Sequence, residues 1–398
     1  MSRRISEGAP LTLPWALGER SPRRPSADAT VLVVTVVLAL IGLVMVFSAS
    51  AIVANNRFHD STYFLKRQIG WLVVGFVILH VGSRIDYLTW RRLALPILGF
   101  SALLLVVVLI PSIGVSAKGA RRWLRFGQVS FQPAEMAKLA AVLYLAAYLA
   151  KKEARVAQLM TGFIPPLVIV GLLSGFILVE PDLGTAVVMI LVALGLLYLG
   201  GARLTHLLSL IPFLAAIAAV AIWQSPYRLQ RLMAFLDSSK DPTGAGFQMN
   251  QSLLAFGSGG LFGLGLGEGR QKLFFLPEGH TDFVLALVGE ELGLVGTATI
   301  LTLFIILVLK GFRIAGRARE PFGRYVAFGI SLLFGLQVLI NAGVVTGLLP
   351  TKGLTLPLVS YGGSSLLVSL LGIGMLLSIS RDRQAGGQSG YGRHLNTR

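Results

Sequence analysis

Long apolar runs follow one another along almost the whole chain, separated by short polar segments. Within each run the apolar residues are nearly continuous rather than alternating with polar ones, which favours helices over the strands of a transmembrane barrel. A helix needs about 20 apolar residues to cross the hydrocarbon core of a membrane. We predict about ten such spans, at 31–47, 69–83, 93–112, 134–150, 162–179, 184–200, 205–223, 283–309, 323–348 and 358–380.

This pattern predicts an all-α, polytopic integral membrane protein, because only helices and closed barrels satisfy every backbone group in lipid. The membrane domain is expected at 30–381, between a disordered cytoplasmic tail at 1–29 and a flexible cytoplasmic tail at 382–398. The largest polar segment, 224–282, separates spans seven and eight and is rich in proline and glycine. We interpret it as a structured extracytoplasmic loop without a core of its own.

Charge sets the orientation of the spans. The 35 Lys and Arg exceed the 18 Asp and Glu, giving a formal net charge of +17. A soluble protein with such a charge would be a candidate for nucleic-acid binding, but here most cations flank alternate ends of successive spans. That is the positive-inside pattern, which places both termini in the cytoplasm and argues against a nucleic-acid partner.

One outer loop departs from this rule, because it carries four cations and no acid. They are Lys118, Arg121, Arg122 and Arg125. One interpretation is an amphipathic interfacial helix with Trp123 and Phe126 at the level of the lipid headgroups. The other is a landing surface for an anionic, lipid-linked substrate.

The fourth predicted span contains a lysine that needs compensation. Lys138 lies three residues after Glu135, so the two share a helix face, and an ammonium inside the bilayer costs about 2.5–3.5 kcal/mol. It therefore requires an anionic partner or a watery cavity. Glu180, Asp182 and Asp282 are expected on the same side of the membrane and are candidate partners.

Each outer carboxylate also has a plain structural interpretation. Thr281 could cap the eighth span with Asp282 in its first turn, and Pro181 could begin the sixth. Glu290 and Glu291 lie about 12 Å deeper along the eighth span, where uncompensated charge is costly. They imply a polar cavity open to the outside or a buried pairing.

The remaining chemistry is limited. With no cysteine, the chain has no disulfide and no thiolate nucleophile. Of the five histidines only His280 falls among the outer carboxylates, and no metal-ligand set emerges. The glycine series at 263–269 fits no phosphate-loop pattern and is interpreted as backbone freedom in tight turns.

Several motifs, in this order, resemble those of the SEDS family (shape, elongation, division and sporulation), over about residues 30–382. They are Gly119–Trp123, Phe131–Lys138, Glu180–Thr185, Leu276–Phe283, Gly289–Gly293 and Leu349–Ser365. The loop 351–355 and the basic N-terminal tail are most similar to the division branch. Ala134 stands where the family often has serine.

The resemblance implies a peptidoglycan glycosyltransferase that polymerises lipid II at the outer face of the bacterial cytoplasmic membrane during septal wall synthesis. It also implies a class B penicillin-binding protein as partner, together with other division proteins and membrane lipid. The family's essential aspartate matches Asp282, and its substrate-cavity positions match Glu135, Lys138, Asp182 and Arg67.

These implied roles agree with the chemistry of the reaction. A base must take the proton of the acceptor hydroxyl, and positive charge must stabilise the departing diphosphate. Asp282 is the candidate base. Lys138, Arg67, Arg121 and Arg122 are candidate diphosphate ligands, with Mg²⁺ or Mn²⁺ as an alternative source of charge.

His280 belongs to the same group as a candidate substrate-binding residue. A lipid II flippase is the main alternative function, since a polar cavity in a helical bundle suits transport as well. A flippase would need a polar route to the inner side, whereas the polar motifs gather on the outer side. A third alternative is a non-catalytic scaffold for the division machinery.

Overall fold

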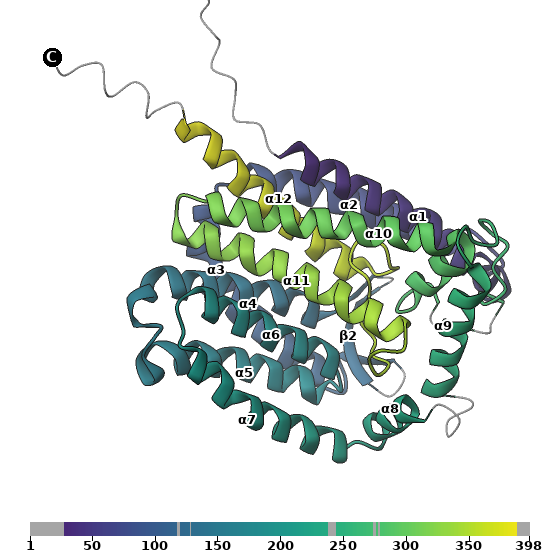
Figure 1. Ribbon diagram of the computed structural model, residues 1–398, viewed down its shortest axis with the longest axis horizontal. Coiled ribbons are helices and arrows are strands. Elements are labelled where there is room, and N and C mark those ends of the chain that lie inside the picture. The colour runs from purple at the N-terminus through teal and green to yellow at the C-terminus, as the bar shows by residue number, and fades with distance from the viewer. Residues whose placement is uncertain are drawn as a thin grey trace, which may run out of the picture.

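The computed structural model describes residues 28–117, 120–127, 129–237, 244–273, 276–277 and 279–387. Long helices run side by side between two ends of a bundle (Figure 1). The first helix begins, and the last helix ends, at the same end of the bundle. Most of the two predicted tails, and Lys118, lie outside the described residues.

Among the described residues, nine helices are long and apolar enough to cross a membrane, when a 3-10 turn is counted with one of them and a π-helical turn with another. Helix α6 is apolar but has only 17 residues, about 25 Å at 1.5 Å per residue, so the total of ten spans stays a prediction. The helices that run along the bundle are α1 (Ala29–Phe58), α2 (Tyr63–Arg84), α3 (Tyr87–Leu109), α4 (Pro133–Lys152), α5 (Ile164–Val179), α6 (Leu183–Leu199), α7 (Leu204–Trp223), α10 (Val284–Arg317), α11 (Pro321–Val345) and α12 (Gly363–Gly387). A 3-10 helix (Glu153–Arg155) and a π-helical turn (Leu159–Phe163) join α4 to α5.

Burial differs greatly among these helices. Most of α4 is buried, because α3, α6, α11 and α12 all pack against it. Helix α7 has no buried residue and makes few helix contacts, so it lies at the edge of the bundle (Figure 1). An apolar helix so exposed is stable only with lipid as its solvent, which confirms a multi-pass membrane protein.

The basic outer loop is a small antiparallel sheet. Its strands are β1 (Gly114–Ala117), β2 (Ala120–Phe126) and β3 (Val129–Phe131), paired in the order β1-β2-β3. The interfacial-helix interpretation of this loop is therefore wrong. Because successive side chains of a strand point to opposite faces, neighbouring basic residues on β2 have different surroundings, as the site shows below.

The large outer loop contains two helices, α8 (Pro226–Leu236) and α9 (Ala245–Gly259), and α9 packs against α10. Residues 260–265 then fit into a break in α10 at Gly293, where φ is +68°. The loop backbone and the broken helix exchange four hydrogen bonds of 2.9–3.1 Å. Several glycines of the predicted series have positive φ, which confirms their role in turns.

Three boundary predictions are wrong. Helix α10 begins at Val284 and its start has no side-chain cap, so Thr281 is no cap and Asp282 precedes the helix. Helix α6 begins at Leu183 rather than at Pro181, and Asp182 is its N-cap. The carboxylate of Asp182 accepts hydrogen bonds from the backbone N–H and the hydroxyl of Thr185. The last helix starts at Gly363, five residues later than predicted, because a turn occupies the positions before it.

The first helix is also longer than predicted, since it continues past the apolar run to Phe58. The small residues at 48–50 are part of this helix, and Ser50 donates its hydroxyl to the carbonyl of Val46.

Candidate active site

A basic pocket of about 120 Å³ lies at the outer end of the bundle, between the α5–α6 turn, α8 and the loop that joins α11 to α12. One carboxylate lines it, that of Asp182. Four basic side chains line it as well. They are Arg122, Arg228, Arg231 and Lys352.

The arginines of the pocket are fixed by backbone carbonyls. Arg122 donates from Nε to the carbonyl of Glu180 (2.8 Å) and from Nη2 to that of Pro181. Arg228 donates to Leu178 (2.8 Å) and Ala221 (2.9 Å), in the last turns of α5 and α7. Helix C-termini carry partial negative charge, which holds cations in place.

Each guanidinium has five N–H donors, so these contacts leave Arg122 and Arg228 able to bind an anion as well.

The other two cations are associated with the loop 346–362, since Arg231 binds it and Lys352 belongs to it. Arg231 donates from Nη1 to the carbonyl of Thr351 (3.0 Å). Lys352 is largely withdrawn from water, and this desolvation lowers its pKa, while the charge of Asp182 opposes the shift. A half-desolvated ammonium beside a single carboxylate is a strong site for a further anion.

Asp282 lies on the other side of this loop. A Cβ placed on Gly353, which lines the pocket, would be 3.2 Å from Oδ2 of Asp282. The same loop residue therefore adjoins both the basic pocket and the candidate base. Of the predicted site residues, Asp182 and Arg122 line the basic pocket, and Asp282 adjoins it at Gly353.

His280 belongs to an aromatic cluster next to Asp282. Its ring centroid is 5.1 Å from that of Phe64 and 5.9 Å from that of Tyr361. Arg67 lies at the same cluster, donating to the hydroxyl of Tyr63 (2.7 Å). Burial raises the pKa of Tyr361, and the charge of Arg67 opposes the shift. His280 is thus two residues from Asp282 along the chain, and Arg67 lies at the same aromatic cluster, but neither lines the basic pocket.

Lys138 and Glu135 form a separate buried pair. Their Nζ and Oε1 atoms are 2.8 Å apart, and both side chains are almost fully buried. The compensation that Lys138 requires comes from its own helix, so Glu180, Asp182 and Asp282 are not its ion-pair partners. The pair does not line the basic pocket, and a substrate role for it stays a prediction.

Glu290 and Glu291 also have partners in the interior: Glu291 is paired with a lysine, and Glu290 accepts backbone N–H groups. Lys272 donates to Glu291 (2.8 Å), as does Ser48 (2.6 Å), and Glu290 accepts the backbone N–H of Arg270 (2.6 Å). These contacts anchor the glycine-rich segment to α10 and α1. Of the two options that the sequence offered for these carboxylates, the buried pairing is the one observed.

Glu180 is the most isolated carboxyl group near the pocket. It is fully buried, and neither carboxyl oxygen has a hydrogen-bond partner among the residues that the structure describes. Burial raises its pKa to about 8, with the negative charge of Asp182 acting in the same direction and Arg122 against it. Glu180 is therefore uncharged at neutral pH, and the pocket keeps its excess of positive charge.

The described residues do not fit a protein-held Mg²⁺ or Mn²⁺. No group of three or more His, Asp or Glu is placed to hold a metal within the described ranges. The one carboxylate that lines the pocket, that of Asp182, shares it with four basic side chains, which repel a cation. The basic side chains themselves supply the positive charge.

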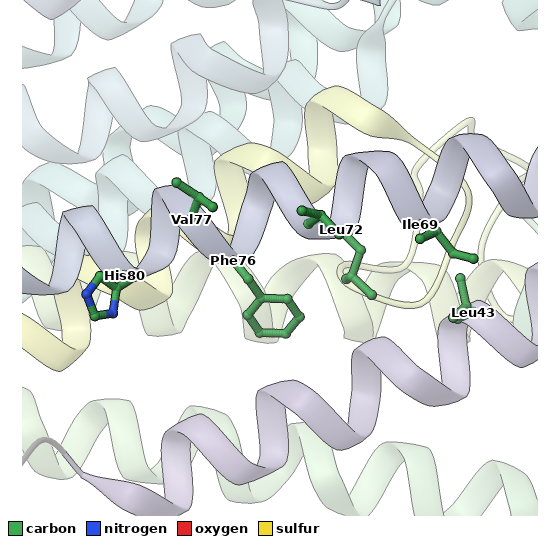
Figure 2. Close-up of a pocket in the computed structure, with 7 residues that line it drawn as sticks. Leu43, Ile69, Leu72, Phe76, Val77 and His80 are labelled. Atoms are coloured by element: carbon green, nitrogen blue, oxygen red, sulfur yellow. The ribbon is translucent and has the colours of Figure 1, made fainter.

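A second, larger hollow is an apolar groove of about 630 Å³ between α1 and α2. Figure 2 shows Phe76 and Leu72 projecting from α2, with Leu43 on α1. His80 is the one polar residue among those that line it. A single imidazole offers no constellation for catalysis.

Sequence reasoning missed four residues of the site: Arg228, Arg231, Lys352 and Asn341. The two arginines are cations on the outer side, so they violate the positive-inside rule just as the residues of β2 do. Lys352 lies in the Leu349–Ser365 motif, to which the sequence alone assigns no chemical role. Asn341, whose Nδ2 donates to the backbone carbonyl of Asp282, could not be identified from the sequence, because a single asparagine in an apolar helix forms no recognisable motif.

Comparison with known proteins gives the same family throughout. The family model described as cell cycle protein, FtsW/RodA/SpoVE, matches residues 28–385. A probable peptidoglycan glycosyltransferase FtsW from Geobacter metallireducens is 49% identical over 353 residues, 89% of this chain and 94% of that protein. Stage V sporulation protein E from Bacillus subtilis is 43% identical over 361 residues, 90% of this chain and 98% of that protein.

Solved structures show the same fold. A chain of a peptidoglycan synthase complex that coordinates polymerization and crosslinking has a TM-score of 0.75 and 30% identity, covering 90% of this chain and 98% of its own. The rod shape determining protein RodA of Thermus thermophilus has a TM-score of 0.67 at 30% identity, covering 90% of this chain and 97% of its own.

Proposed function

The chain belongs to the FtsW/RodA/SpoVE family of cell cycle proteins, and on that basis we propose that it is a peptidoglycan glycosyltransferase that polymerises lipid II. The reaction would take place at the outer face of the cytoplasmic membrane. The observation that carries this proposal is the basic pocket at the outer end of the bundle, separated from Asp282 only by the loop residue Gly353.

The arrangement supports a single displacement. The hydroxyl oxygen of the acceptor sugar attacks the anomeric carbon of the donor sugar and forms the new glycosidic bond. The bond from that carbon to the diphosphate oxygen breaks, and the lipid diphosphate departs with the electron pair. Asp282 takes the hydroxyl proton, and one base with a stabilised leaving group leads to inversion at the anomeric carbon.

The basic pocket has the right charge for the leaving group. A departing diphosphate gains negative charge in the transition state, and fixed positive groups that surround it lower the barrier. Arg122, Arg228 and Lys352 would surround the diphosphate, and the two arginines need little reorganisation because backbone carbonyls already hold them. Arg67 and His280, which lie at the same aromatic cluster, would contact the acceptor sugar.

The partner and the place of action follow from the relatives. The relatives described above include a probable FtsW protein, and one solved chain comes from a synthase complex that coordinates polymerization and crosslinking. We therefore propose a class B penicillin-binding protein as partner, septal wall synthesis as the process, and contact with other membrane proteins of the division machinery.

The decisive experiment uses purified protein with its class B partner and lipid II, and measures both glycan polymer and lipid movement in vesicles. Polymer from the native pair, and none from Asp282→Asn at equal abundance, is the expected result. Lipid movement without polymer from either protein would overturn the proposal in favour of a flippase, and neither activity would favour a scaffold.

A further inference from the structure

Asn341, near the outer end of α11, is a buried amide with two acceptors. Its side chain is 2% exposed. Nδ2 donates one hydrogen bond to the carbonyl of Asp282 (2.9 Å) and another to the carbonyl of Leu354 (2.7 Å). One side chain thus joins the segment that carries the candidate base to the loop that carries Lys352.

These two segments are held together elsewhere as well. The backbone N–H of Tyr361 donates to the carbonyl of His280 (3.0 Å). Gly353 lies close enough to Asp282 that a Cβ there would be 3.2 Å from Oδ2. Asn341 is the one contact among these that comes from a helix of the bundle rather than from the two segments themselves.

The orientation of the amide is determined by its surroundings. Nδ2 faces two carbonyl oxygens, and a reversed amide would place Oδ1 against them. Oδ1 is buried and has no hydrogen-bond partner within the described part of the chain. Native structures keep few such groups, because an unpaired buried acceptor is unfavourable, so the two contacts of Nδ2 must offset this cost.

We propose that Asn341 is a positioning residue, which sets the carboxylate of Asp282 relative to the basic pocket across the loop 351–354. It binds Asp282 through the main chain, so the contact does not occupy the carboxylate. The inference rests on the proposed function, because it assigns Asn341 a role in that reaction. Small errors in the placement of a reacting group are costly, of the order of 100-fold in rate for about 1 Å.

The test is steady-state kinetics of polymer formation from lipid II by the protein with its class B partner. Asn341→Leu keeps most of the volume and removes both donors, and Asn341→Asp keeps the shape but turns an acceptor toward the two carbonyls. We expect kcat to fall about 10- to 100-fold in both, with KM for lipid II within about two-fold of native. In Asn341→Asp, part of the loss should be recovered at acid pH, where the protonated carboxyl regains a donor.

Gln337→Leu is the matched control, since Gln337 is a buried amide one turn away on the same helix. Its kcat should remain near native. Native kcat in both Asn341 variants would overturn the proposal, as would a loss of activity that parallels an equal loss of thermal stability, because Asn341 would then act only in folding. If the native protein forms no polymer at all, the proposed function itself fails.

Discussion

At the scale of single residues, the site is distinguished by an excess of positive charge: four basic side chains line the pocket together with one carboxylate. Lys138 and Lys272 are buried, and the charge of each is compensated by a carboxylate oxygen at 2.8 Å. Lys352 differs from both. It is partly desolvated, the nearby charge of Asp182 opposes the lowering of its pKa, and it lines a pocket with three arginines. Uncompensated positive charge at a pocket indicates an anionic ligand.

Replacing Lys352 by methionine should therefore impair the reaction itself. The side chain keeps its length but loses its charge, and loss of one transition-state donor lowers the rate about 10²- to 10³-fold. We expect such a fall in kcat/KM for lipid II, with Lys352→Arg less affected. Lys66→Met is the control, because Lys66 is an exposed outer lysine paired with Asp60. Equal activity of the Lys352 and Lys66 variants would contradict the role.

Glu180 leads to a prediction about pH. Its pKa is about 8 in the folded protein against 4.5 for the ordinary group, so the folded state binds the proton more tightly. The stability that the neutral carboxyl contributes is complete below about pH 4.5 and is lost as the pH rises through about 8. The thermal unfolding temperature in detergent should fall over this range in the native protein.

Glu180→Gln keeps a neutral side chain at every pH, so its unfolding temperature should fall less over the same range. Glu268→Gln, at an exposed carboxylate, is the control and should follow the native curve. If the native protein and Glu180→Gln have parallel curves between about pH 5 and pH 9, Glu180 is not the protonated group that we infer.

At the scale of elements, strand geometry sorts residues that the sequence leaves equivalent. Arg121 and Arg122 are neighbours, and both were candidate diphosphate ligands. On β2 they point to opposite faces, so Arg122 lines the pocket while Arg121 is exposed. The short strands could not be predicted, because the hairpin has only 3–7 residues per strand and its basic residues also suit an interfacial helix.

The two arginines provide a matched pair for mutation. Arg122→Ala should lower kcat/KM for lipid II by about 10-fold or more, because it removes a charge from the leaving-group pocket. Arg121→Ala should change it by less than about two-fold, as is usual for an exposed surface group. Assays of both variants at matched abundance decide the point, and an equal effect of the two substitutions would mean that the loop acts only through its overall charge.

At the scale of the whole molecule, the bundle was predictable and the site only in part. Each span must satisfy its own backbone in lipid, so apolar runs and flanking cations predict the helices and their direction without knowledge of their neighbours. The site depends on segments that are distant in sequence, such as Asp182 and Lys352, or Asn341 and Asp282. Their proximity arises from packing of α6, α10 and α11, which no local pattern encodes.

The division of labour between base and pocket can be tested directly. The measurement is binding and single-turnover transfer of lipid II by the purified protein with its class B partner, comparing native chain, Asp282→Asn and Lys352→Met. We predict that Asp282→Asn binds lipid II with near-native affinity but forms no glycosidic bond, whereas Lys352→Met binds it more weakly. Transfer at the native rate by Asp282→Asn would contradict the account, because the reaction would then need no base at that position.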